Sequence, residues 1–554
     1  MSVRPCPGAE VPALTARIAR ASNPGGTTAM WVRDRLDGLW QDEDFAGWYS
    51  RDGRPGLSPA QLATVSVLQF VLNLSDRQAA EAVRCRTGFK YALGLELDDP
   101  GFHHSVLTDF RDRLAEDGHA DQLPDFALER IKQAGLITER GKARTDSTYV
   151  LAAVRDLTRL ELITEAVRAA LEELAREDPG MLDELIDRDW ATRYGRPVRL
   201  GGQPSRPAAR LKQAGQDTYL LLTILERNQR QGGPDSDGLR RIFLQNFLIA
   251  EGKVRPRTGE DGLPPASLRI ISPYDLQARF AMRGDTRWAG YLIHVTETCD
   301  EDTVNLVTDV ATTVSAVKDH EALALIHARL ARRALLPAEH LADGGYITLG
   351  HLHAAAGQQI TMAGPPGHNS SWQARGNTGF ALADFATGSG KRQVTCPAGK
   401  TIGNWLDTGP AGRAPIVVVK SGKRLCDPCP SRASCTRSSE GRTVSFPPRH
   451  LHELQGRNRE QQTGPDWLRA YGVRSGVEGT VAEFTGGHRA RRCRYHGHAK
   501  THTQHILTAI AVNAERLYAH ESSGHRERQP TAFQKYIIGR ELPIPHWWGK
   551  GGCP

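Results

Sequence analysis

Hydrophobic and polar positions alternate in two different ways along this chain. Near the N-terminus, apolar residues recur at helical spacing through Pro59–Leu74, residues 76–89 and Ser105–Leu114. A serine precedes each of the first two stretches, as is typical of a helix N-cap. The pattern predicts an all-helical domain over residues 1–140, which fits either a plain bundle or a bundle containing a helix-turn-helix.

The middle of the chain changes to strand-like patterns. β-rich runs alternate with helical periodicity in the order strand, strand, strand, helix, strand, helix, strand, which is typical of a mixed α/β sheet. The runs with definite bounds are Ala143–Leu151, Tyr291–Glu297, Thr303–Val310, the helix Asp319–Leu335, His340–Asp343 and Gln359–Ala363.

This order requires that residues 155–269 form an insertion between the first two strands. Helical spacing of Leu160 to Leu174, and again over Ala208–Arg227 and Gly238–Ala250, predicts that the insertion is helical. The Gly-, Pro- and charge-rich stretch Glu251–Pro265 predicts a loop.

A second insertion, residues 366–465, contains two β-like runs, Ile416–Lys420 and Thr443–Phe446, and is followed by helical sequence from Trp467 to Tyr518. The predicted fold class is α/β: a mixed-sheet core with an N-terminal all-helical domain, a helical insertion and a small β insertion. The core combines residues 141–154, 270–365 and 466–520, and residues 521–554 form a C-terminal tail.

Composition narrows the class of protein. Of 554 residues, 39% are hydrophobic and 24% charged, which indicates a globular chain. Lys and Arg exceed Asp and Glu by 71 to 63, which favours a polyanionic partner. The most apolar stretch, Leu62–Leu74, is too short to span a bilayer, and the first residues lack a signal-peptide core, so we expect a cytoplasmic protein with reduced cysteines.

Four of the nine cysteines lie within forty residues. Cys426 and Cys429 have the spacing of a metal knuckle, and Cys396 and Cys435 complete a set of four thiols. Such a set predicts a structural Zn²⁺ site, the alternative being buried thiols without metal. Basic residues that suit phosphate contact flank the set: Lys400, Lys420, Lys423, Arg424, Arg432 and Arg437.

Three acidic positions are candidates for catalysis. Asp146 lies within a predicted strand, and Asp343 ends a short strand and is followed by two glycines. Tyr471, Arg474 and Glu478 are spaced to share one face of a helix. Converging carboxylates repel one another and favour Mg²⁺ binding. Taken singly, each acid fits equally a turn carboxylate or a surface ion pair.

The densest basic patch follows Glu478 directly. It consists of Arg489, Arg491, Arg492, Arg494 and Lys500. Beside a metal site these side chains would neutralise backbone phosphates of DNA, whereas elsewhere they would form a solvated loop.

Taken together, the motifs resemble the DDE transposases of bacterial insertion sequences. Asp146 in TDST, Asp343 in ADGGY, and Tyr471, Arg474 and Glu478 are similar to the group with a Tyr-x2-Arg-x3-Glu-x6-Lys motif. HSVLTDFRDRL, ISPYDLQARF, CPAGKT, CDPCPSRASC and RYHGHAKTHTQHILTAIAVNAERL extend the resemblance over most of the chain.

The resemblance implies a ribonuclease H-like core in which Asp146, Asp343 and Glu478 bind Mg²⁺ or Mn²⁺. It also implies an insertion before the Glu-bearing helix, which accounts for the 478 − 343 = 135 residues between the last two acids. Thr485 stands where the motif has a DNA-contacting Lys, and Arg489 or Arg491 are candidates to replace that contact.

The function implied is DNA transposition by a cytoplasmic, nucleoid-associated bacterial protein. A homodimer would cleave DNA at the ends of its element and transfer the strands to target DNA. The N-terminal helices would bind the terminal inverted repeats, and Tyr471 and Arg474 would position phosphate or a flipped base. Two alternatives remain: a domesticated metal-dependent nuclease of the same fold, and a non-catalytic, zinc-stabilised DNA-binding protein.

Overall fold

The computed structural model describes residues 10–542, apart from a set of short segments. Those segments are residues 51, 55, 184, 199–205, 229–231, 302, 366–370, 376–378, 409–414, 450, 452, 455, 456, 458–461, 463, 524–530 and 541. The expected C-terminal tail therefore lies largely outside the described residues.

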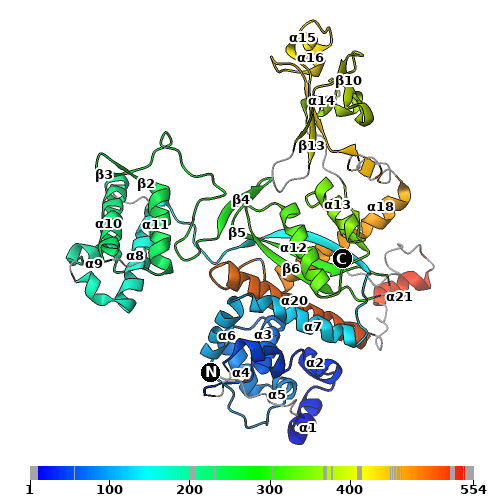
Figure 1. Ribbon diagram of the computed structural model, residues 1–554. Coiled ribbons are helices and arrows are strands. Elements are labelled where there is room, and N and C mark those ends of the chain that lie inside the picture. Colours follow the sequence, from blue (N-terminus) through cyan, green and yellow to red (C-terminus); the bar gives the residue numbers. More distant parts are fainter. Residues whose placement is uncertain are drawn as a thin grey trace.

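The protein is elongated, with a sheet at its centre (Figure 1). N-terminal helices form one end and a small β module, labelled by β13, α15 and α16, forms the other. The helical insertion projects to one side. The central sheet therefore lies between the two ends of the molecule.

The N-terminal end is helical, as predicted. Ser58 and Ser75 cap α3 and α4 by accepting hydrogen bonds from the backbone N–H groups of Gln61 and Gln78. The predicted helix over residues 76–89 is two helices, because the chain turns to extended backbone at Arg86. The elements are α1 (Ala13–Ser22), α2 (Thr28–Leu36), η1 (Asp42–Trp48), α3 (Pro59–Val71), α4 (Asp76–Cys85), α5 (Thr87–Leu93), α6 (Ser105–Ala115), η2 (His119–Asp121) and α7 (Gln122–Gln133).

A six-stranded mixed sheet forms the core, which confirms the predicted α/β class. Its order is β4-β5-β1-β7-β8, and β6 also pairs with β5. β5 runs antiparallel to β1, whereas β7 and β8 run parallel to it. The strands are β1 (Lys142–Leu151), β4 (Arg279–Arg283), β5 (Thr286–Thr298), β6 (Val307–Val314), β7 (Glu339–Ala342) and β8 (Thr361–Ala363). Helices α12 (Asp319–Arg332) and α13 (Leu349–Gly357) connect β6 to β7 and β7 to β8.

Several strands differ from the prediction: β5 begins at Thr286 rather than Tyr291, and β8 begins at Thr361 rather than Gln359. β6 begins at Val307 rather than Thr303, because the preceding residues form a turn in which the Leu306 N–H donates to the Thr298 hydroxyl. β4 was not predicted, since its side chains are mostly exposed and leave little hydrophobic signal.

The helical insertion has a hydrophobic core of its own. The prediction of helix through Ala250 is wrong, because the chain turns back after α11. Glu251 and Gly252 both have positive φ and join the antiparallel strands β2 and β3, and this two-residue turn requires left-handed backbone. Part of the predicted loop is thus strand. The elements are α8 (Arg159–Glu177), η3 (Pro179–Leu182), α9 (Arg188–Tyr194), α10 (Pro207–Arg227), α11 (Pro234–Asn246), β2 (Phe247–Ala250) and β3 (Lys253–Pro256).

The cysteine-bearing module is also packed around its own core. The predicted strands Ile416–Lys420 and Thr443–Phe446 are confirmed as β13 and β14. With β12 (Trp405–Thr408) they form one three-stranded sheet, and β9 (Ala386–Gly388), β10 (Gln393–Thr395) and β11 (Thr401–Ile402) form another. The short helical segments are α14 (Trp372–Arg375), η4 (Leu382–Asp384), η5 (Ser389–Lys391), α15 (Lys423–Cys426) and α16 (Arg432–Cys435).

The last helices return the chain to the sheet. α20 packs between the N-terminal helices and the sheet, and its Leu507 and Ile510 belong to a hydrophobic core that also includes Leu68 and Leu323. The N-terminal domain therefore shares a core with the sheet domain. The elements are α18 (Pro465–Gly472), η6 (Val473–Ser475), α19 (Gly476–Ala482), η7 (Glu483–Gly487), α20 (His498–Ser523) and α21 (Ala532–Gly539). Among the helices that the structure describes, none has both the length and the apolar character needed to cross a membrane.

Candidate catalytic site

Two predicted acids lie level with each other on adjacent parallel strands. Thr145 of β1 pairs with Ala342 of β7, so Asp146 and Asp343 are the next residues of neighbouring strands. The Ser147 N–H donates to Asp146 Oδ1 at 2.8 Å, and the Gly345 N–H donates to Asp343 Oδ1 at 2.8 Å. Each carboxylate thereby keeps its second oxygen for another partner.

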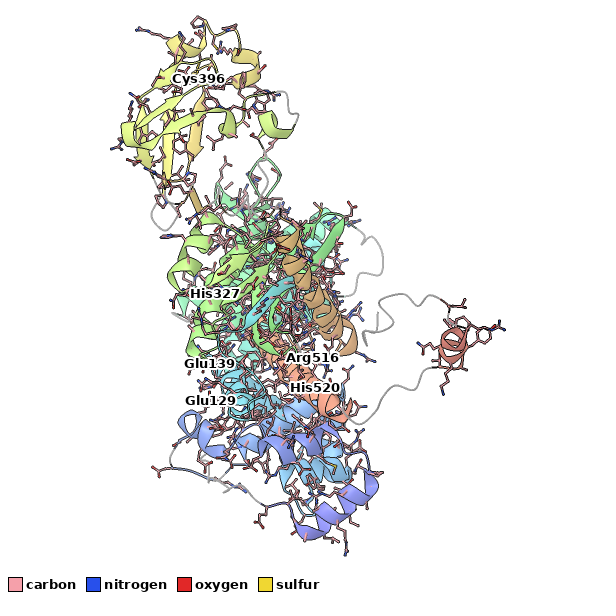
Figure 2. All side chains as sticks on the ribbon, turned by 90° about the vertical axis from the view of Figure 1, so that its right-hand side faces the viewer. Glu129, Glu139, His327, Cys396, Arg516 and His520 are labelled. Atoms are coloured by element: carbon pink, nitrogen blue, oxygen red, sulfur yellow. The ribbon has the colours of Figure 1, made fainter. Side chains whose placement is uncertain are left out.

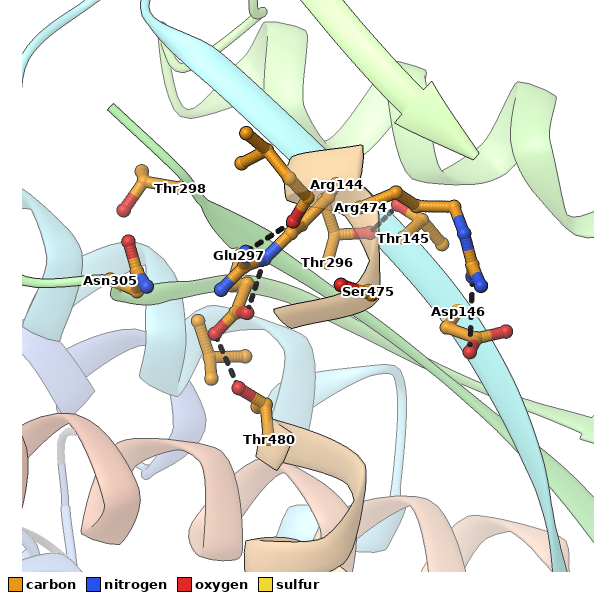
Figure 3. Close-up of polar contacts among 12 residues, drawn as sticks. Arg144, Thr145, Asp146, Thr296, Glu297, Thr298, Asn305, Arg474, Ser475 and Thr480 are labelled. Carbon is orange, nitrogen blue, oxygen red and sulfur yellow. Dashed lines mark hydrogen bonds and ion pairs between the residues drawn. The ribbon is translucent and has the colours of Figure 1, made fainter. Parts of the chain in front are cut away.

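The third predicted acid, Glu478, is linked to Asp146 through Arg474, which a broken helix positions between them. The prediction that Tyr471, Arg474 and Glu478 share one helix is wrong: α18 ends at Gly472, and the 3₁₀ turn η6 separates it from α19. The side chains nevertheless meet the site, because Arg474 lies 3.3 Å from Asp146 Oδ2 and 3.0 Å from Glu478 Oε1. Figure 3 shows Arg474 directed at Asp146. The Tyr471 hydroxyl donates to the Ala342 carbonyl at 3.2 Å.

The surroundings of Asp146 raise its pKa. Burial raises the pKa of Asp146, and the nearby charge of Asp343 raises it further, while Arg474 opposes both effects. Burial alone would lower the pKa of Arg474, but the carboxylates of Asp146 and Glu478 raise it overall. The site therefore holds negative charge that needs a cation, and Arg474 supplies one in the absence of other ligands.

A buried polar network fixes the helix that carries Glu478. Arg144 Nε donates to Glu297 Oε1 at 2.7 Å, and Arg144 Nη1 donates to the Val473 carbonyl at 2.6 Å. The Thr480 hydroxyl and Arg516 donate to the other oxygen of Glu297 at 2.6 and 2.7 Å. Figure 3 shows the contacts of Arg144 and Thr480 with Glu297, which join β1, β5 and α19. The network positions α19 relative to Asp146, the neighbour of Arg144 in β1.

The sequence reading missed this network and one further acid. Arg144 and Glu297 are cross-strand partners, which only the strand register reveals. Asp319, the first residue of α12, accepts a hydrogen bond from the Ser147 hydroxyl at 2.9 Å. An acid in the first turn of a helix is so common that it gives no signal in the sequence.

The predicted basic patch is divided. Arg491 donates to the Tyr149 carbonyl at 2.6 Å and stacks on its ring, and Arg494 donates to the Leu74 carbonyl at 2.8 Å. Lys500 forms a 2.6 Å ion pair with Asp112. These three side chains link structural elements. The remaining two, Arg489 and Arg492, are exposed.

Thr485, which replaces the motif Lys, lies in the π-helical turn η7. Its hydroxyl donates to the Val481 carbonyl at 2.8 Å, so its polar atom is used within the helix. Arg489 follows two residues after this turn, with positive φ and an exposed side chain. Of the two candidates to replace the Lys contact, Arg489 is the one whose side chain remains available.

The four predicted zinc ligands line one cavity. Cys396, Cys426, Cys429 and Cys435 surround a volume of about 30 Å³ and form no disulfide. Burial raises the pKa of the Cys435 thiol, and the three neighbouring thiols raise it further. Figure 2 shows Cys396 in this module, far from His327 and Arg516 of the core.

Neither the three acids nor the four cysteines have the geometry of a metal site. Within the described part of the chain, no three His, Cys, Asp or Glu side chains are placed so as to hold an ion. The donor types still fit: carboxylate oxygens suit Mg²⁺ or Mn²⁺, and four thiols suit Zn²⁺. At the acids, arginine side chains supply the positive charge: Arg283 lies beside Asp343 and Arg474 beside Asp146.

Comparison with known proteins gave two matches to family models. Residues 28–113 match a transposase domain (DUF772), and residues 395–518 match a transposase DDE domain. The second match includes the four cysteines and the Tyr471, Arg474 and Glu478 run, but neither Asp146 nor Asp343. No curated protein and no solved structure matches the chain.

Proposed function

Because the chain is a DDE transposase of the insertion-sequence type, as its two family matches indicate, we propose that it cleaves DNA at the ends of its element and joins them to target DNA. The observation that best supports this proposal is the convergence of Asp146, Asp343 and the Arg474–Glu478 pair from three separate elements. The strand order, with β5 antiparallel to β1 and β7 parallel, supports a ribonuclease H-like core.

The three acids would hold the metal that DDE transposases generally use. Mg²⁺ or Mn²⁺ on Asp146, Asp343 and Glu478 would supply the positive charge that activates a water or 3′-hydroxyl and stabilises the leaving oxygen. Burial and the Asp343 charge raise the pKa of Asp146 even with Arg474 beside it, so a further cation would stabilise its ionised form.

The chain's own cations would bind the DNA strand. Arg474 presents a planar guanidinium between Asp146 and Glu478, and the same group binds phosphate bidentately. Tyr471 stacks on Trp467 with ring centroids 4.6 Å apart, which would offer an aromatic surface near an unpaired base. Arg489 and Arg492, both exposed, would contact phosphates farther from the cut.

The flanking domains would bind the rest of the DNA. Arg77, Arg84 and Arg86 are exposed in and just after α4, which suits binding of terminal repeats by the N-terminal helices. A structural Zn²⁺ held by the four thiols would stabilise the cysteine module. Two ends must be brought together for transposition, so the active species would be a homodimer.

Strand transfer of a labelled terminal DNA fragment into plasmid tests the proposal. We expect wild type to cleave and join with Mg²⁺ or Mn²⁺, and Asp146→Asn to do neither. Asp466→Asn, which changes an exposed carboxylate in α18, is the matched control and should stay active. Cleavage without joining would identify a nuclease, and DNA binding without cleavage would identify a non-catalytic DNA-binding protein.

Zinc content is tested separately by elemental analysis of the purified chain. We expect about one zinc per chain from a closed four-thiolate site. Cys429→Ser should lose the metal and Cys85→Ser, which changes an exposed thiol in α4, should retain it. Wild-type protein without zinc would overturn the assignment of the cysteines.

A further inference from the structure

A hairpin outside the recognised motifs carries a cation to the acids. β4 and β5 pair antiparallel up to Arg283 and Thr286, so Gly284 and Asp285 form the turn. Gly284 has φ +58°, as a two-residue hairpin turn requires. Arg283 Nη2 lies 3.6 Å from Asp343 Oδ2 and 3.9 Å from Asp319 Oδ2.

Asp319 is a fixed part of this arrangement and not a loose surface acid. Its side chain is 13% exposed and accepts the 2.9 Å hydrogen bond from Ser147. His294 Nδ1 lies 3.9 Å from its Oδ1. A Cβ atom on Gly345 would lie 2.9 Å from both Asp319 and Asp343, so only glycine leaves room for two carboxylates here.

Arg283 itself is held loosely. Its side chain is 60% exposed, and both of its ion pairs are long, so solvent screens them. Arg474, by contrast, is 16% exposed and wedged between its acids. A guanidinium in the position of Arg283 can leave the carboxylates for a phosphate at little cost, and phosphate offers it two parallel hydrogen bonds.

The same hairpin provides an internal control. Arg287 pairs across the ladder with Met282, so it lies on the face opposite Arg283 and Thr286. It is exposed and forms no ion pair with any residue that the structure describes. The two arginines thus lie on the same hairpin and carry the same charge, but only Arg283 faces the acids.

We propose that Arg283 is a phosphate-binding residue of the catalytic site, which Asp319 holds ready beside Asp343. In the DNA-free protein, Arg283 supplies counter-charge to the two carboxylates. When DNA binds, Arg283 moves to a phosphate of the cleaved strand and leaves the carboxylates to the metal. Asp319 is a positioning residue in this exchange. The inference rests on the proposed transposase function and adds a residue that lies outside its motifs.

The test compares Arg283→Gln, Arg283→Lys and Arg287→Gln in the full chain. Mn²⁺ binding to DNA-free protein is measured by electron paramagnetic resonance. Binding to end-containing duplex is measured in EDTA over a series of salt concentrations. Arg283→Gln should bind Mn²⁺ about two- to five-fold more tightly, the effect of losing one competing exposed ion pair. It should bind DNA more weakly, with a salt slope smaller by about one.

The other variants separate charge from geometry. Arg283→Lys should bind Mn²⁺ like wild type, because the charge is kept, but should bind DNA more weakly, because the bidentate fork is lost. Arg287→Gln should leave Mn²⁺ affinity unchanged. Asp319→Asn keeps an acceptor for Ser147 but removes the charge that holds Arg283, so it should lower DNA affinity in the wild-type background and have no further effect in Arg283→Gln.

The results that would overturn the inference differ from those that would overturn the function. If Arg283→Gln and Arg287→Gln bind Mn²⁺ equally and lose DNA affinity equally, Arg283 has no special role, although wild type still cleaves. If wild type neither binds Mn²⁺ nor cleaves, the proposed function fails and takes the inference with it.

Discussion

Two arginine–carboxylate groups lie side by side in this protein in opposite surroundings. Glu297 is fully buried and accepts hydrogen bonds from Arg144 and Arg516. Glu478 lies two residues before Thr480, which joins the buried group, yet it is 62% exposed and pairs with Arg474. These two groups therefore place the same chemistry inside the fold and at its surface.

The difference assigns the two groups different tasks. Removing one partner of a buried pair leaves an uncompensated charge and costs about 3–5 kcal/mol, whereas an exposed pair contributes about 0–1 kcal/mol. The Glu297 group can therefore fix α19 in place, and the Glu478 group can exchange its arginine for another cation without unfolding the chain. Structure is maintained by the first group and ligand exchange is possible at the second.

Glu478→Gln tests most directly whether the exposed group serves catalysis and not stability. Cleavage should fall by about 10³-fold or more, the scale of losing one preorganised charged group at a reacting centre. The free energy of unfolding should change by less than about 0.5 kcal/mol, because the side chain is exposed. Gel assays of cleavage and urea unfolding provide the two measurements. A variant that loses stability but keeps wild-type cleavage would reverse the assignment.

Glu297→Gln tests the buried half. We expect the free energy of unfolding to fall by about 3–5 kcal/mol, because Arg144 and Arg516 lose the charge between them. Urea unfolding measures the change, and Glu483→Gln, which removes a partly exposed partner of Arg516, should cost less. Equal losses in the two variants would show that burial does not distinguish them.

Two glycines of α19 allow the same comparison between buried and exposed surroundings, with smaller expected changes in stability. A Cβ on Gly476 would overlap the Arg144 guanidinium, whereas a Cβ on Gly479 would meet nothing within 4 Å. Gly476→Ala should therefore cost about 1–3 kcal/mol through overpacking, and Gly479→Ala should stabilise the helix by about 0.5–1 kcal/mol. Thermal unfolding would measure both, and a Gly476→Ala variant as stable as Gly479→Ala would contradict the close approach of Arg144.

The exposed group could be predicted from sequence and the buried one could not. Tyr471, Arg474 and Glu478 lie within eight residues, so a family motif can include all three. Arg144, Glu297 and Arg516 are separated by 153 and 219 residues and meet only when β1 pairs with β5 and α20 packs beside them. Their association depends on strand register, which a hydrophobic pattern does not specify.

The same reason explains which parts of the fold were predicted. β13 is an apolar strand, β1 is rich in Thr, Tyr and Val, and β7 ends at an Asp-Gly-Gly turn, and such signals identify strands in a sequence. β2 and β4 are short and half exposed, so the preceding helix pattern and the surrounding loop residues outweighed them. Asp319 was missed because its partner Ser147 is 172 residues away in the chain.

A third polar set, the buried histidines His327 and His340, gives the smallest predicted effect. Burial, and to a smaller extent the charge of His351, lower the pKa of His327 to about 4, although the charge of Asp309 opposes them. His327 Nε2 lies 2.9 Å from His340 Nδ1, and burial lowers the pKa of His340 to about 3. Both rings are therefore neutral in the folded protein at pH 7.

The sign of the pH dependence follows from these lowered values. The unfolded chain binds protons near pH 6.5 and the folded protein only near pH 3–4, so stability is fully present above about pH 6.5 and falls as the pH drops towards 4. His327→Gln removes one of these two groups. Between pH 6 and 4.5, the free energy of unfolding of this variant should therefore fall less steeply than that of wild type, the slopes differing by about 1.4 kcal/mol per pH unit.

Urea unfolding at a series of pH values separates the slope from any constant loss caused by the missing hydrogen bond to His340. If wild type and His327→Gln have the same slope, His327 is not held neutral by burial. These histidines would then resemble the exchangeable Glu478 group more than the fixed Glu297 group. Burial in the sheet would not be enough to separate fixed polar groups from exchangeable ones.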